Sequence, residues 1–237
     1  MDKFLSTIRR QHQSNMKKGI IYLILIGILC TCNKKDELSQ VVINVPQDNV
    51  LFFPEELSNS DYNILFIGNS LTYTNNLPEL VKQKASQKGI TVGTKMIANP
   101  NFALLDHWDI GETQQYIASK KFNFVVIQQG PSSQAFGREV LIKYGKRYSD
   151  LCTSNDAQLC YFMVWPSLTY YNTFDDVIKN HRDAATINEA LLCPVGDVWK
   201  THFDTTNDFD YYGPDGFHPS SIGSQVAADV IVDSLFP

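Results

Sequence analysis

The chain has 237 residues, of which 43% are hydrophobic, so it is long enough for one sizeable α/β core but hardly for two independent domains. Its formal charge is −5, and removal of residues 1–31 would leave 15 basic and 24 acidic residues, a formal charge of −9. This acidic balance argues against nucleic acid as a partner, because phosphate backbones bind basic surfaces.

The N-terminal region carries the pattern of an export signal. Lys17 and Lys18 precede an apolar run over residues 20–29, which ends at Cys30-Thr31-Cys32. The run is short for a membrane-spanning helix, and its basic, apolar and small-residue order predicts a signal peptide over residues 1–31.

The end of this segment resembles a bacterial lipoprotein signal, in which Cys32 becomes acylated after cleavage. Thr31 stands where such signals usually have Gly, Ala or Ser, and a plain membrane-anchoring helix is the alternative. The resemblance implies an extracytoplasmic protein that is lipid-anchored to a bacterial membrane. The polar run NKKDELSQ follows, and we expect residues 32–60 to form a tether and a segment at the edge of the domain.

The first predicted strand of the domain ends in a serine. Its apolar run, 64–67, fits a strand buried on both faces of a parallel sheet, and Gly68-Asn69-Ser70 interrupts it. A helix is expected from Pro78 to Lys88. Ser70 then lies at the carboxyl end of a strand, where open α/β sheets bind ligands, although an ordinary turn uses the same residue types.

The rest of the domain alternates strands with helices. We expect strands over 91–97, 124–127, 159–165 and 195–198, and helices over 102–108, 113–119, 140–151, 174–192 and 221–235. This alternation predicts a three-layer α/β/α sandwich around a parallel sheet.

A second polar motif precedes the last predicted helix. In the run YYGPDGFHPS, Asp215 and His218 stand three residues apart on a loop rich in Gly and Pro, and Ser220 or Ser221 is a candidate N-cap. The spacing lets the Asp215 carboxylate bind one imidazole nitrogen of His218. The other nitrogen is then free to act as a general base toward a serine. The alternative to a catalytic pair is that Asp215 and Ser220 are only turn and cap residues and that His218 is a surface histidine.

The order Ser70, Asp215, His218 resembles the SGNH, or GDSL-like, hydrolases over residues 61–237. The resemblance implies a flavodoxin-like fold with strand order 2-1-3-4-5. It also implies a catalytic domain in which Ser70 is the nucleophile, Asp215 and His218 complete a triad, and the Ser70 N–H binds the oxyanion.

The two middle motifs of that family differ in this chain. The second reads Ala98-Asn99-Pro100-Asn101-Phe102, without the usual Gly, and the third reads Gly130-Pro131-Ser132-Ser133, with Ser132 at the usual Asn position. Oxyanion donors are therefore sought among several side chains and backbone groups. The candidates are Ser70, Asn101, Ser132, Gln128 and Gln129.

The expected activity is hydrolysis of an ester, with an O-acetyl group on a carbohydrate as the substrate favoured by analogy with the family. The partner is then a small-molecule or oligosaccharide ester. Two alternatives are a lipid or lysophospholipid esterase, and a carbohydrate-binding or assembly lipoprotein that is catalytically weak. No metal-ligand spacing or cofactor fingerprint occurs in the sequence, so no metal and no cofactor are expected.

Three further sets of residues have open roles. His107 is expected to pack its loop rather than line the cleft, and His202 to lie on a surface loop. Cys152 and Cys160 are candidates for a disulfide, although small buried hydrophobes are the favoured interpretation. Aromatic side chains are more often part of a core, and a sugar-stacking surface, for which only two or three need be exposed, is the alternative for those that fall on predicted loops: Trp108, Trp165, Tyr170, Tyr171, Tyr211, Tyr212 and Phe217.

The anchor prediction is tested by the substitution Cys32→Ser. Loss of the acylated residue is expected to release the protein from membranes, because the lipid supplies the membrane affinity. Fractionation of cells into membrane and soluble protein measures this, and unchanged membrane partitioning would rule out acylation at Cys32.

Overall fold

The computed structural model describes residues 51–237. The predicted signal peptide, Cys32 and the first part of the tether lie outside the described residues and stay predictions. Within residues 51–237, no helix combines the length and the apolar character that a membrane crossing requires. A short 3₁₀ helix, Glu55–Ser58, buries Leu57 at the edge of the domain.

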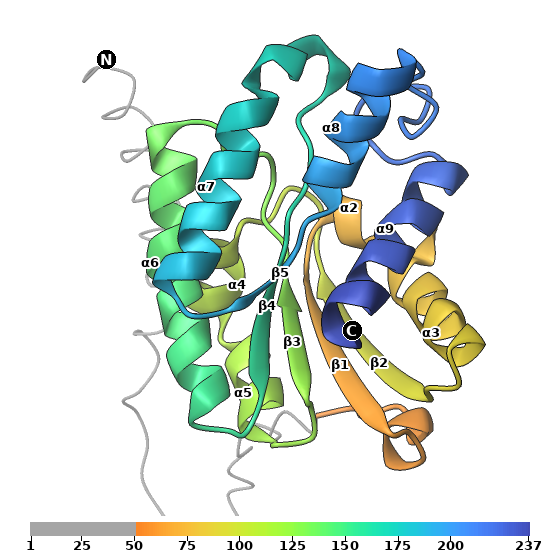
Figure 1. The fold of residues 1–237 in the computed structure, drawn as a ribbon. Helices are drawn as coiled ribbons and strands as arrows, with labels where there is room; N and C mark the ends of the chain where they lie inside the picture. Colours follow the sequence, from red (N-terminus) through yellow and green to blue (C-terminus); the bar gives the residue numbers. More distant parts are fainter. Residues whose placement is uncertain (1–50) are drawn as a thin grey trace, which may run out of the picture. The chain divides into compact units, whose positions relative to one another are not determined.

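The core is a five-stranded parallel sheet (Figure 1). Its order is β2-β1-β3-β4-β5, which confirms the expected 2-1-3-4-5 arrangement. The strands are β2 (Val92–Ala98), β1 (Tyr62–Gly68), β3 (Phe124–Ile127), β4 (Gln158–Phe162) and β5 (Leu191–Cys193).

Both faces of the central strand are covered, which explains its unbroken apolar run. Ile64 and Phe66 of β1 point into one hydrophobic cluster, whereas Leu65 and Ile67 point into the other. All four side chains are fully buried. Successive residues of a strand face opposite sides of its sheet, so only a sheet with two covered faces accommodates four apolar residues in a row.

Helices form the two outer layers (Figure 1). One cluster is completed by α3 (Leu77–Gln87), α8 (Val195–Thr206) and α9 (Ser221–Leu235). The other is completed by α4 (Leu104–Ile110), α5 (Glu112–Ala118) and α6 (Ala135–Thr153). Residues of α7 (Phe174–Ile187) enter both clusters. The three-layer prediction is therefore confirmed.

The last part of the sheet differs from the prediction. The fifth strand is Leu191–Cys193, whereas residues 195–198 begin α8, and α7 ends at Ile187. Leu191 and Leu192 continue the apolar pattern of α7, so sequence periodicity joins them to that helix. The chain leaves the helix through Glu189, whose φ is 51°, and α8 begins after Pro194. His202 consequently lies on α8 and not on a loop.

The three described cysteines are buried free thiols. Cys160 is not paired with Cys152; its Sγ lies 2.9 Å from Sγ of Cys193, on the neighbouring strand β5. Burial raises the pKa of the Cys152 thiol to about 12, so this side chain behaves as a small hydrophobe.

Candidate active site

Three loops meet at the carboxyl edge of the sheet. Gly68 at the end of β1 pairs with Ala98 at the end of β2, and Ile67 pairs with Ile127 at the end of β3. The residues that follow each strand therefore leave the same edge side by side. A hollow of about 330 Å³ lies there, within the size range of small-ligand pockets.

Ser70 is held at the start of a short helix, α2 (Ser70–Tyr73). Asn69 is the N-cap, and its side-chain oxygen accepts a hydrogen bond from the Leu71 N–H at 3.1 Å. The Asn69 amide also donates to the Phe102 carbonyl at 3.0 Å, which joins the turn to the loop after β2. Ser70 is half-buried and lines the hollow, so its hydroxyl is accessible from solvent.

Gln128 joins the same turn to the end of β3. Its side-chain oxygen accepts from the Asn69 N–H at 2.8 Å and from the Thr72 hydroxyl at 2.9 Å, and the residue is only 1% exposed. A Cβ at Gly68 would lie 2.3 Å from Thr72 Oγ1 and 2.5 Å from Gln128 Oε1. Glycine therefore permits the close approach that brings the Gln128 oxygen against the turn.

His107 contacts the turn between β1 and α2 and does not line the hollow. It is 2% exposed, and its Nε2 donates to the Gly68 carbonyl at 2.7 Å. Burial lowers the pKa of His107, so its neutral form is favoured. This is the packing role that the sequence suggests.

Asp215 and His218 form a hydrogen-bonded pair on the loop between α8 and α9. His218 Nδ1 donates to Asp215 Oδ2 at 2.6 Å, and Asp215 Oδ1 accepts the N–H groups of Phe217 and His218, each at 2.9 Å. These hydrogen bonds hold the pKa of Asp215 below its usual value, and the bond from the His218 side chain has the largest effect. The geometry fixes the tautomer of His218 and leaves Nε2 for another partner.

Other segments hold this loop in place. Asn75, five residues after Ser70, donates to the carbonyls of Pro219 and Ser220, both at 3.1 Å. Trp165, which follows β4, donates from its Nε1 to the Phe217 carbonyl at 3.0 Å. Ser220 caps α9, with its hydroxyl oxygen accepting from the Gly223 N–H at 3.0 Å. The loop is thus held on both sides of His218, by the segment after Ser70 on one side and by Trp165 on the other.

Phe217 lines the hollow together with Ser70, which brings the histidine loop to the serine. Among the described residues, no hydrogen bond joins Ser70 to His218; such bonds are often long until a substrate is bound.

The candidate oxyanion donors differ in what their hydrogens already bind. Ser132 donates its hydroxyl hydrogen to the Gly130 carbonyl at 2.9 Å, and the Gln129 amide donates to Ser132 Oγ and to the Gly137 carbonyl, both at 3.1 Å. These two side chains therefore have no free hydrogen to offer.

Three candidates keep an uncommitted donor. The Ser70 N–H is the first of its helix, a position without an intrahelical acceptor. Asn101 is exposed at the rim of the hollow, with a left-handed φ of 62°. The Gln128 Nε2 amide is buried without a partner, but Gln128 does not line the hollow. Ser70 and Asn101 are thus the accessible donors.

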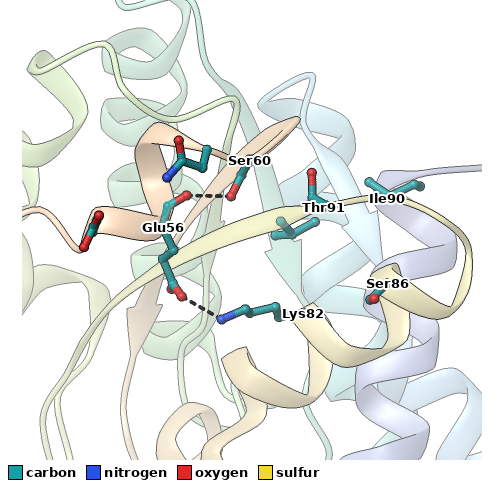
Figure 2. A pocket seen from close by; sticks show the side chains of 9 residues that line it. Glu56, Ser60, Lys82, Ser86, Ile90 and Thr91 are labelled. Atoms are coloured by element: carbon teal, nitrogen blue, oxygen red, sulfur yellow. Dashed lines mark hydrogen bonds and ion pairs between the residues drawn. The ribbon is translucent and has the colours of Figure 1, made fainter.

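A separate hollow lies at the opposite end of the sheet, beside the start of β2 (Figure 2). Lys82 of this hollow lies 2.6 Å from Glu56, which also lines it, and 3.6 Å from Glu79 on α3. The Lys82 hydrogen bond lowers the pKa of Glu56, and the same bond raises the pKa of Lys82. This paired cluster is a structural contact between the edge segment and α3.

His202, Asp208 and Asp210 have side-chain atoms of the kinds that bind metal ions, and these atoms lie within 4.8 Å of one another. His202 Nε2 is already hydrogen-bonded to Asp210 Oδ1 at 3.0 Å, between α8 and the loop that bears His218.

The substitution Gln128→Leu tests the contact between the turn and β3. Two buried donors lose their acceptor while one unpartnered amide is removed, so we expect the free energy of unfolding to fall by about 1–3 kcal/mol. Urea denaturation measures this change. Gln134→Leu, the same exchange at an exposed position, is the control and should stay within about 0.5 kcal/mol. Equal effects of the two substitutions would contradict the proposed contact.

The fold was compared with that of known proteins. No model of a protein family matches the sequence, and no curated protein matches it. Among solved structures, the chain is similar to a candidate SGNH hydrolase from Slackia heliotrinireducens, with 24% identity, 73% of this chain and 98% of that chain covered, and a TM-score of 0.64.

Two other structures show the same likeness at lower identity. A lipase/acylhydrolase from Enterococcus faecalis is 16% identical, with 73% and 95% of the two chains covered and a TM-score of 0.59. A DUF4886 family protein from Bacteroides uniformis is 16% identical, with 74% and 83% covered and a TM-score of 0.58. With the strand order and the placement of Ser70 at the sheet edge, these likenesses show that the chain has the fold of the SGNH, or GDSL-like, hydrolases.

Proposed function

We propose that the protein is a serine esterase in which Ser70, His218 and Asp215 act together. The observation that carries the proposal is the 2.6 Å hydrogen bond from His218 Nδ1 to Asp215, on a loop tied to the segment that bears Ser70. This bond orients the imidazole and stabilises its protonated form during the reaction. The similar structures include a lipase/acylhydrolase, which supports the same class of reaction.

The reaction proceeds in two halves. Ser70 Oγ attacks the ester carbonyl carbon while His218 Nε2 takes the hydroxyl proton, and that proton passes to the alcohol oxygen as its bond to the carbonyl carbon breaks. Water then attacks the acyl-serine, with His218 taking a water proton and returning it to Ser70 Oγ. The products are a free alcohol and a carboxylic acid, and no cofactor is required.

Negative charge on the carbonyl oxygen needs hydrogen-bond donors. The Ser70 N–H and Asn101 are the groups we assign to this task, because Ser132 and Gln129 already donate to protein acceptors. Loss of one such donor typically costs a factor of about 10² to 10³ in rate. Ser132 stands at the usual Asn position of the family and already donates to the Gly130 carbonyl, so it supplies no donor to the hole. This missing donor favours a slow esterase, and the same observation favours a catalytically weak binding protein as the second candidate function.

The substrate we propose is a small acyl ester of a carbohydrate, with acetyl as the acyl group. The hollow beside Ser70 contains no charged side chain, so it suits a neutral ester. A lipid ester is the competing substrate within the same mechanism.

Hydrolysis of p-nitrophenyl acetate tests the mechanism. Ser70→Ala and His218→Ala are each expected to lower kcat by about 10³-fold or more, because the nucleophile or its base is lost. Ser132→Ala is the matched control: it alters a serine in the same hollow that has no role in the attack, and kcat should stay within about tenfold of the wild type. Wild-type protein that is no faster than Ser70→Ala would refute the esterase and favour the binding function.

A further inference from the structure

A second hollow adjoins the one that contains Ser70. Its volume is about 500 Å³, and the two hollows share Pro131 and Phe217 in their walls. Phe217 directly precedes His218, so the shared wall lies beside the imidazole that transfers the proton. A substrate that reaches from one hollow into the other would place its scissile bond near Ser70 and His218.

The second hollow has an aromatic side chain that is open to solvent. Tyr170 is 64% exposed, and among residues 51–237 its hydroxyl has no hydrogen-bond partner. It belongs to a 3₁₀ segment, Leu168–Thr173, that follows β4. The Leu168 N–H donates to the Gly216 carbonyl at 2.7 Å, which fixes this segment against the histidine loop. The backbone that carries the Tyr170 ring is therefore fixed relative to the loop that bears His218.

The remaining lining combines apolar rings with small polar groups and no charge. Pro131 and Pro166 supply flat apolar surface, and Ser133, Ser167 and Thr173 supply hydroxyl groups. An aromatic face with hydroxyl and amide groups around it matches a sugar ring, which has apolar C–H faces and a polar rim. The Thr173 hydroxyl already donates to the Tyr170 carbonyl at 2.8 Å, which leaves the hydroxyls of Tyr170 and Ser167 to bind a ligand. An alkyl chain would offer these two hydroxyls no hydrogen bond, and an anionic headgroup would find no cation among the lining residues.

We propose that this hollow, the Tyr170 hollow, binds the alcohol part of the ester as a neutral glycosyl residue, while the hollow at Ser70 receives the acyl group. Tyr170 stacks on the sugar ring and Phe217 separates the two parts at the scissile bond. The inference rests on the proposed esterase function and adds where the alcohol binds and which side chain recognises it.

The test compares acetate esters of a sugar and of a simple alcohol, glucose pentaacetate and ethyl acetate, with acid release followed by pH-stat titration. Tyr170→Ala is expected to raise KM for glucose pentaacetate by about three- to tenfold, because one stacking contact is lost. Its kcat/KM for ethyl acetate should be unchanged, since ethanol does not reach the Tyr170 ring. Tyr170→Trp keeps a stacking face and should restore the wild-type KM.

Phe52→Ala is the matched control, because Phe52 is an exposed aromatic (70%) that lines neither hollow. Equal KM values for wild type and Tyr170→Ala, or equal losses on both esters, would overturn the sugar site while the esterase stands. A Tyr170→Ala defect confined to ethyl octanoate would assign the hollow to an acyl chain and would also overturn it. If wild type and Ser70→Ala hydrolyse every ester at the same rate, the proposed function itself fails, and the inference fails with it.

Discussion

The oxygen of one buried amide determines where the nucleophile lies. Gln128 accepts from the Asn69 N–H and the Thr72 hydroxyl, on either side of Ser70, and so ties the strand-to-helix turn to the end of β3. A buried donor without a partner is costly, so the turn has a single low-energy position relative to the sheet. Gly68 makes the contact possible, because any side chain there would displace the amide. The position of Ser70 therefore depends on residues from two strands.

The histidine is positioned by a second set of long-range contacts. Asp215 fixes the imidazole locally, whereas Asn75, just before α3, and Trp165, just after β4, fix the backbone of the loop. The pair Asp215–His218 is partly exposed, so its charge interaction is screened and its main effect is orientation. Precision at this site comes from hydrogen bonds to a rigid scaffold, which suits a group that transfers protons.

Local patterns in the sequence predict most of the sheet and the two polar motifs. The run before Gly68 and the N-cap at Ser220 are decided by residues close in the chain, and α9 begins and ends where its pattern indicates. The three-residue strand β5 fails such a prediction, because its apolar residues continue the helical pattern before it. Long-range contacts, such as those between Asn75 and the chain 144 and 145 residues away, leave no local signal. For the same reason the sequence leaves five candidate oxyanion donors. The structure reduces them to Ser70 and Asn101, because the Ser132 and Gln129 side chains already donate to protein acceptors and Gln128 does not line the hollow.

The most direct test of this account is covalent labelling with a fluorophosphonate, followed by mass spectrometry of the digested protein. The account predicts one adduct, on the peptide that contains Ser70, formed much more slowly in His218→Ala because the base that activates the hydroxyl is missing. Wild-type protein that takes up no label, or that carries the label on Ser132 or any other serine, would contradict the claim that Ser70 is an activated nucleophile.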